Sequence, residues 1–205
     1  MVKKIESTEE KIITSAKSVF IRKGIDGARM QEIADEAGIN KSLLHYYFRS
    51  KDKLFDRVFS ESFLPVAKTI SRVFESSPDI NTLIEGFVTN YIILLRKNPH
   101  LPHFILHELN RNPERIVEQI QSSNFNKTRI VELLSNDADA NKLKAFDPIH
   151  IVVNIIALCV FPFVAQPILQ GFLFNDNEAD FQKFINERTQ HIIAFVKSAI
   201  FINHS

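Results

Sequence analysis

Apolar residues recur along this chain at intervals of three and four positions, the spacing that places them on one face of an α-helix. In the first such segment Ile12, Ile13, Ala16, Val19 and Phe20 form an apolar face, and the residues between them are polar. No segment of any length alternates between apolar and polar residues as a half-buried strand does. The pattern therefore predicts an all-α chain.

Residues that favour helix ends divide the first fifty positions into short helices. Ser7 and Glu10 have the spacing of a capping box, in which each side chain accepts a hydrogen bond from the backbone of the other residue. Gly24 favours a helix end, while Asn40 and Ser50 can cap the helices that follow them. These signals predict a first helix from the capping box to Gly24, then helices at 29–36, at 41–47 and from 51 onward.

Beyond residue 76 the same periodicity predicts longer helices, separated by Ser-Pro and Asn-Pro pairs and by polar stretches. They are expected near 80–97, 101–110, 113–122, 126–134, 148–172 and 180–202. Segment 148–172 is apolar on nearly all sides, and Pro162 is expected to kink it. Its longest apolar run, 155–165, is interrupted by Pro162 and is far shorter than the roughly 20 residues of a spanning helix. We therefore interpret it as a buried helix and expect no membrane span.

Composition narrows the class of protein without identifying a function. A chain of 205 residues can form one or two domains. The formal net charge is +1, but residues 1–60 hold 12 Lys and Arg against 9 Asp and Glu, so a nucleic-acid partner would need a local cationic surface. The single cysteine, Cys159, excludes an intramolecular disulfide, and no apolar stretch follows the N-terminal lysines. Both features favour a cytoplasmic protein.

The two shortest predicted helices, joined by Ala37-Gly38-Ile39, have the layout of a helix-turn-helix. Leu44 and Phe48 would face the core, which turns the stretch's lysine, serine, histidine and tyrosine side chains outward. Tyrosine hydroxyls and lysines donate to DNA phosphates. Lys51 begins the next helix, where a cation opposes the helix dipole but suits a phosphate. Alternatively, the tyrosines could simply pack against neighbouring helices.

The stretch STEEKIITSAKSVFIRKGIDGARMQEIADEAGINKSLLHYYFRSKDKLF resembles the N-terminal domain of the TetR (tetracycline-repressor-like) family of bacterial regulators. Residue types agree at many spaced positions: Phe20, Gly24, Ile33, Ala34, Ala37, Gly38, Leu44, Tyr46, Phe48, Lys51 and Leu54. The resemblance implies a helix-turn-helix domain at 1–50 and a larger helical ligand-binding and dimerisation domain at 51–205. It also implies a homodimer on double-stranded DNA with two half-sites, and a small-molecule effector.

The family's DNA contacts carry over to matching positions of this chain. Residues expected to reach base edges are Gln31, Lys41, Ser42, Leu43 and His45. Those expected at phosphates are Tyr46, Tyr47 and Lys51. Arg29 stands where the family often has a threonine and is expected to make a phosphate contact instead, and His45 replaces a usual tyrosine, so base preference cannot be transferred.

The second half matches the family only in its helical layout. The family's dimer elements correspond to segments 148–172 and 180–202, and the alternative is that their apolar faces form a monomeric core. Aromatic residues of the middle helices suggest a pocket for an apolar or amphipathic ligand, although such residues can equally be plain core. The candidate ligand residues are Phe87, Tyr91, Phe104, His107 and Phe161.

Three histidines, His100, His103 and His107, share the spacing of one helical face and are followed by Glu108. Imidazoles one turn apart can bind zinc, but Pro99 and Pro102 disturb the helix start and no known metal motif is present. An enzyme using these groups and a protein-interaction module are the rival interpretations. We expect a transcriptional regulator, a repressor released by its ligand, with no enzymatic activity, metal or cofactor.

Overall fold

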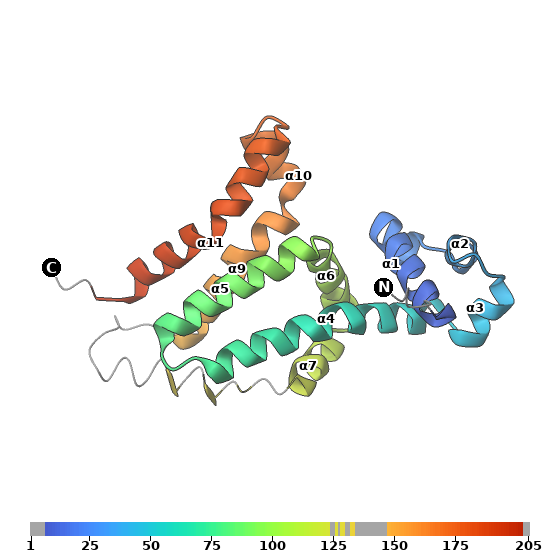
Figure 1. The fold of residues 1–205 in the computed structure, drawn as a ribbon, viewed down its shortest axis with the longest axis horizontal. Helices are drawn as coiled ribbons and strands as arrows, with labels where there is room; N and C mark the ends of the chain where they lie inside the picture. Colours follow the sequence, from blue (N-terminus) through green and yellow to red (C-terminus); the bar gives the residue numbers. More distant parts are fainter. Residues whose placement is uncertain (1–6, 124–125, 127, 130–131, 134–146, 203–205) are drawn as a thin grey trace, which may run out of the picture. The chain divides into compact units, whose positions relative to one another are not determined.

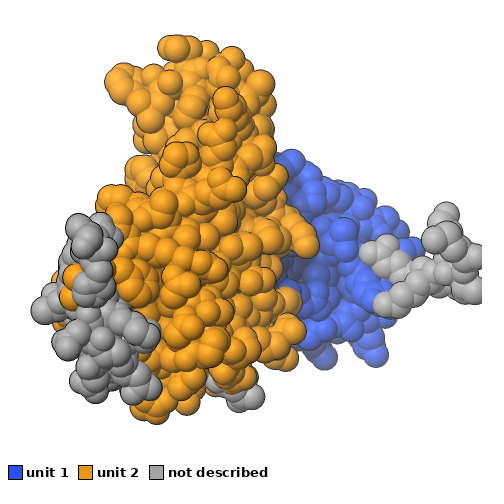
Figure 2. All heavy atoms as spheres, turned by 60° about the vertical axis from the view of Figure 1, so that its left-hand side comes forward, with its two compact units in different colours: residues 1–63 blue, residues 64–205 orange. Residues whose placement is uncertain are grey.

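The computed structural model describes residues 7–123, 126, 128–129, 132–133 and 147–202. The described residues are predominantly helical and contain no strands, which confirms the predicted all-α fold. The chain divides into two compact units, residues 1–63 and 64–205 (Figure 2). Part of the helix predicted at 126–134, namely residues 127, 130–131 and 134, lies outside the described residues.

The first unit contains α1 (Thr8–Gly27), α2 (Met30–Glu36), α3 (Lys41–Tyr47) and the beginning of α4 (Lys51–Ser76), labelled in Figure 1. The capping box is confirmed, because Ser7 N–H donates to Glu10 Oε2 at 2.8 Å and Glu10 N–H donates to Ser7 Oγ at 3.1 Å. Gly24 leaves the helical conformation at φ 67° and ψ 173°, and a further turn continues to Gly27. The regular part of α1 therefore ends at Gly24, as the sequence predicts. The sequence did not predict the additional turn that extends α1 to Gly27.

An aromatic core holds this unit together. Phe20 of α1 meets Phe55 of α4 edge to face, with ring centroids 5.4 Å apart. Phe55 in turn stacks towards Phe59, one turn further along α4. All three side chains are buried, so α1 and α4 form a scaffold on which the two short helices pack.

The second unit contains the rest of α4 and seven further elements of the described chain. They are α5 (Ile80–Lys97), α6 (Leu101–Arg111), α7 (Pro113–Ser122), α9 (Pro148–Val164), α10 (Gln166–Ile168), the π-helical turn η1 (Leu169–Leu173) and α11 (Glu178–Ile200). Helices α5, α9 and α11 pack against one another (Figure 1). Their shared core includes Val88, Leu95, Cys159 and Ile192. It is held together mainly by burial of aliphatic side chains.

The predicted continuous helix at 148–172 is wrong. Helix α9 continues through Pro162 to Val164. The helix is interrupted at Ala165, and the segments before and after this residue lie at 65° to each other. Pro167 lies in the first turn of α10, where a missing N–H leaves no helical bond unmade. Among the described helices none is long and apolar enough by itself to cross a membrane, and only this bent pair meets the length and composition of a span.

Candidate DNA-binding surface

The turn between α2 and α3 is built by backbone hydrogen bonds and one glycine. Ala37 N–H donates to Ile33 O at 3.0 Å and Ile39 N–H donates to Ala34 O at 3.0 Å. Gly38 has φ 68°, a conformation in which a Cβ atom would be strained. Asn40 Oδ1 then accepts from Leu43 N–H at 2.8 Å, which caps α3 and makes it begin at Lys41 as predicted.

Helix α3 turns one apolar side chain inward and its polar and ring side chains outward. Within α3, all of whose residues are described, Leu44 alone is buried, at 0% exposure, and Phe48 just beyond the helix is buried too. Leu43, which precedes Leu44, is 37% exposed, and Tyr46 is 74% exposed. The side chains predicted to meet DNA are all exposed on this helix: Lys41, Ser42, Leu43, His45, Tyr46 and Tyr47.

The two tyrosines meet edge to face, with ring centroids 5.6 Å apart and planes at 89°. This contact orders two rings that otherwise project into solvent. Exposed aromatic rings with a terminal hydroxyl bring both apolar surface and a hydrogen-bond donor to a partner. The arrangement therefore fits a surface that binds another molecule.

Two residues at helix α2, Gln31 and Arg29, were also predicted to contact DNA. Gln31 Nε2 donates to Asp35 Oδ1 at 2.8 Å, so one of the two N–H groups of the Gln31 amide is engaged within α2. Arg29 is exposed at the N-cap of α2 and makes no capping hydrogen bond with its side chain in the described part of the chain. Its guanidinium can therefore extend towards a phosphate, as the sequence predicts.

Two carboxylates of α2 are paired with cations of α1. Arg22 bonds Glu36 at 2.5 Å, and this hydrogen bond holds the pKa of Glu36 below its ordinary value. Lys23 lies 2.6 Å from Glu32. These pairs offset much of the negative charge that α2 would otherwise present beside a polyanion.

Lys51, the first residue of α4, makes hydrogen bonds that the sequence did not predict. Its ammonium donates to the carbonyl oxygens of Ala28 at 3.1 Å and Asp26 at 3.3 Å. Two of its three N–H groups are therefore directed at the connection between α1 and α2, which leaves one for the predicted phosphate contact.

The family model for bacterial regulatory proteins, tetR family, matches residues 12–58, which run from α1 into α4 and include the whole helix-turn-helix. The N-terminal domain of this chain belongs to the TetR family. TetR-family proteins are DNA-binding transcriptional regulators, and this chain is one of them. The resemblance noted in the sequence is therefore confirmed.

Curated relatives and solved structures extend the similarity over the rest of the chain. YttP of Bacillus subtilis, named a probable HTH-type transcriptional regulator, is 24% identical over 171 residues, or 82% of this chain and 83% of YttP. The HTH-type transcriptional repressor SCO4008 of Streptomyces coelicolor is 32% identical over 103 residues, 50% of each chain. The ketosteroid transcriptional regulator KstR2 of Mycobacterium tuberculosis is 14% identical and matches with a TM-score of 0.70 over 98% of both chains, which shows a shared fold.

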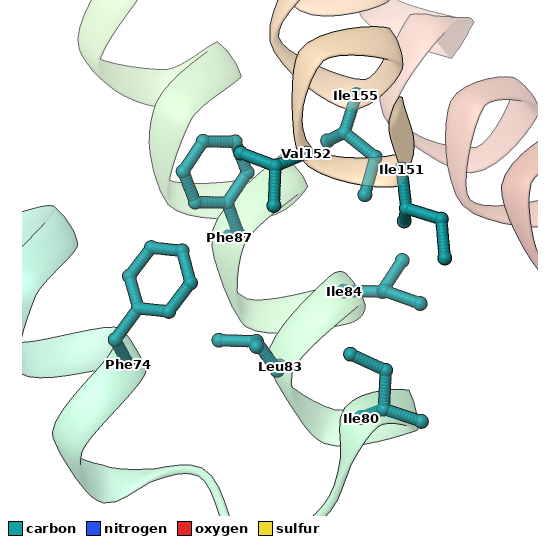
Figure 3. A pocket seen from close by; sticks show the side chains of 8 residues that line it. All are labelled: Phe74, Ile80, Leu83, Ile84, Phe87, Ile151, Val152 and Ile155. Atoms are coloured by element: carbon teal, nitrogen blue, oxygen red, sulfur yellow. The ribbon is translucent and has the colours of Figure 1, made fainter. Parts of the chain in front are cut away.

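In the second unit of this TetR-family chain, the candidate ligand residues are not gathered at one cavity. Phe87 lines a small apolar cavity of about 30 Å³ between α4, α5 and α9 (Figure 3). Tyr91 packs on Phe87 with ring centroids 5.3 Å apart, and Phe104 is buried on α6 beside the half-buried His107. Phe161 is 59% exposed and does not line this cavity. The cavity holds roughly one water, far less than the several hundred Å³ of a drug-sized site.

Glu108 is the one charged side chain that is fully buried in the described chain, at 0% exposure. Its Oε1 accepts from Arg115 Nη1 at 2.7 Å, and its Oε2 has no hydrogen-bond partner among the described residues. The sequence did not indicate this pair. Arg115 follows Glu108 by two turns, but Pro113 starts a new helix between them, so helical spacing could not predict their contact.

The three histidines do not form a centre with other ligands. His100 is the N-cap of α6 and His103 is exposed on it. Within the described ranges, no group of three or more His, Cys, Asp or Glu side chains is arranged to hold a metal ion. The described geometry therefore gives no support to the metal-based rival interpretation.

Helices α9 and α11 expose large apolar side chains, although they also form the core of their unit. On α9 these include Ile149, Val153 and Ile156, and on α11 Phe195 is 63% exposed. The groove beside Phe195 is lined by Leu158, Arg188, His191 and Ile192. Exposed apolar surface of this extent on two long helices is typical of a protein–protein contact.

Proposed function

We propose that this TetR-family chain is a cytoplasmic repressor that binds a palindromic operator as a homodimer. The observation that carries the proposal is the outward composition of α3: a lysine, a histidine and two tyrosines around one exposed leucine, with Leu44 alone turned to the core. A helix of this kind fits the major groove, where its first residues meet base edges.

Each exposed group of α3 has a chemical partner on DNA. Lys41 would donate to guanine O6 and N7 or to a phosphate, and Leu43 would contact a thymine methyl group. His45 and Ser42 would contact bases beside them, and Gln31 would contact a base from α2 through the second N–H or the carbonyl oxygen of its amide. Arg29, Tyr46, Tyr47 and the remaining N–H of Lys51 would bind phosphates.

The dimer would form through the exposed apolar faces of α9 and α11. Two copies related by a two-fold axis would cover the same side chains on both partners. The two recognition helices would then lie about one turn of DNA apart, or a multiple of it, which is the reason for expecting a palindromic site.

An apolar or amphipathic effector would release the repressor from DNA. The supporting observation is the aromatic and aliphatic lining around Phe87 and Tyr91, which contains no cationic cluster for a phosphorylated compound. The cavity seen here is too small for such a molecule, so the effector would have to bind a more open conformation and favour it over the DNA-binding one.

Selection of bound duplexes from a random pool tests the proposal. The full chain should enrich a palindrome with two equal half-sites, and a variant with Lys41→Ala and Tyr46→Phe should enrich it far less at the same protein concentration. Gln190→Glu, on the face of α11 turned away from Phe195, serves as the matched control. Failure to enrich any duplex at low salt would favour the rival interpretation of a protein-interaction module.

A further inference from the structure

The connection between α1 and α2 sets where the helix-turn-helix begins. Gly24 has a positive φ, Ala28 is extended at φ −74° and ψ 139°, and Arg29 continues the extended chain to the N-cap of α2. Arg29 does not cap α2 with its side chain in the described part of the chain. The geometry of this connection therefore depends on contacts from elsewhere in the unit.

Lys51 supplies such a contact from the start of α4. Its Nζ donates to Asp26 O at 3.3 Å and Ala28 O at 3.1 Å, across 25 and 23 positions of sequence. The last turn of α1, all of which is described, contains no basic residue of its own to bond these carbonyls. A hydrogen bond from an ionised donor is roughly twice as strong as one between neutral groups, so the contact is well suited to hold the connection in place.

The position of Lys51 in its own helix supports a tertiary role. A cation in the first turn of a helix is disfavoured by the helix dipole, so α4 gains nothing from a lysine there. Lys53, two residues later, is exposed, and its side chain does not bond the connection in the described part of the chain. The two lysines therefore share the same charge and the same helical turn but differ in their contacts.

We propose that Lys51 is a positioning residue for DNA binding. By bonding the carbonyls of Asp26 and Ala28, its ammonium ties the connection to the start of α4, which directly follows α3. The bond thereby holds α2 and Arg29 in register with the recognition helix. The inference rests on the DNA-binding role of the family, and it assigns Lys51 an effect on affinity that a phosphate contact does not require.

Amide hydrogen exchange and salt-dependent duplex binding test the proposal with three variants. Lys51→Met keeps the aliphatic stem and removes the ammonium, Lys51→Arg keeps a charged donor, and Lys53→Ala removes a neighbouring charge. Exchange is measured without DNA, so its outcome does not depend on the proposed operator. Binding is measured on the selected duplex at a temperature where every variant is folded.

In Lys51→Met we expect amides of residues 25–33 to exchange at least tenfold faster than in the wild type and in Lys53→Ala, with Lys51→Arg close to the wild type. Affinity should fall about tenfold or more. The slope of log affinity against log salt should flatten as well, because the remaining N–H of Lys51 is proposed to bind a phosphate, so the exchange result is the one that distinguishes the positioning role. If Lys51 acted only at phosphates, the slope would flatten by about two for a dimer, at roughly 0.9 per contact, and exchange would stay unchanged.

Unchanged exchange in Lys51→Met overturns the proposal, whatever happens to the salt slope. Should Lys51→Met prevent folding, Lys51→Gln is compared with Lys53→Gln instead. A glutamine at position 51 retains a weaker neutral donor, so faster exchange than in Lys53→Gln supports the positioning role, and equal exchange refutes it.

Discussion

Leu43 and Leu44 form a matched pair that tests how the recognition helix is turned. They are adjacent and chemically identical, but Leu44 is 0% exposed in the core and Leu43 is 37% exposed on the face proposed to meet DNA. Truncation to alanine removes the same atoms from both. The two variants should therefore lose different properties, stability in one case and base contact in the other.

The expected magnitudes follow from burial. Leu44→Ala opens a cavity beneath α3 and should lower the free energy of unfolding of the first unit by about 2–5 kcal/mol. Leu43→Ala should lower it by no more than about 1 kcal/mol, because its side chain is partly in solvent. On the selected duplex, Leu43→Ala should lose about 1 kcal/mol of apolar contact at each half-site, or roughly thirtyfold in affinity for a dimer.

Urea unfolding and duplex titration on the same samples separate the two effects. The chain has no tryptophan and three tyrosines, of which Tyr46 and Tyr47 lie in α3, so tyrosine fluorescence reports mainly on the first unit. The reasoning would be refuted if Leu43→Ala destabilised this unit more than Leu44→Ala. It would be equally refuted if Leu43→Ala left affinity unchanged at a thymine-containing half-site.

Three further predictions concern the second unit. Phe195→Glu should weaken the proposed dimer at least tenfold in sedimentation equilibrium, because it places a carboxylate in an apolar contact on both subunits, whereas Gln190→Glu should leave the mass unchanged; equal masses for both variants would exclude α11 from the interface. Arg115→Met should cost about 3–5 kcal/mol in thermal or urea unfolding by leaving Glu108 buried without its cation, and adding Glu108→Leu should recover most of that loss; no recovery would show that the pair is not the cause. Burial raises the pKa of the Cys159 thiol from 9.0 to about 12, so the native thiol should resist iodoacetamide at pH 8 until urea unfolds the chain. The free energy of unfolding should fall as pH rises above 9, where only the thiol of the unfolded chain ionises. Rapid alkylation of the native protein would contradict the burial of this side chain.

Local signals in the sequence were sufficient where a structure depends on residues a few positions apart. The bounds of α3, α5 and α7 agree with the predicted ranges, because caps, prolines and apolar spacing act within one or two helical turns. The facing of α3 was predictable for the same reason. Once Leu44 and Phe48 are assigned to the core, the geometry of a helix turns the ring side chains outward.

The break at Ala165 and the placement of Phe161 could not be predicted in this way. Segment 148–172 is apolar on nearly every side, so its periodicity does not distinguish a buried face from an exposed one. Which of its side chains point to α5 and which to solvent is decided by the packing of α9 against α5 and α11. Phe161 is consequently exposed, although its aromatic side chain in an apolar segment suggested a pocket residue.

The sequence by itself determined the helices, their caps and the family of the DNA-binding domain, because these depend on short-range spacing and on residue types at many matching positions. Only the tertiary structure decided that Lys51 bonds the carbonyls of Asp26 and Ala28, and that Arg115 meets the buried Glu108. Both contacts join residues on different helices. Which residues meet depends on the direction in which each helix continues after its turn, and a local sequence pattern does not specify that direction.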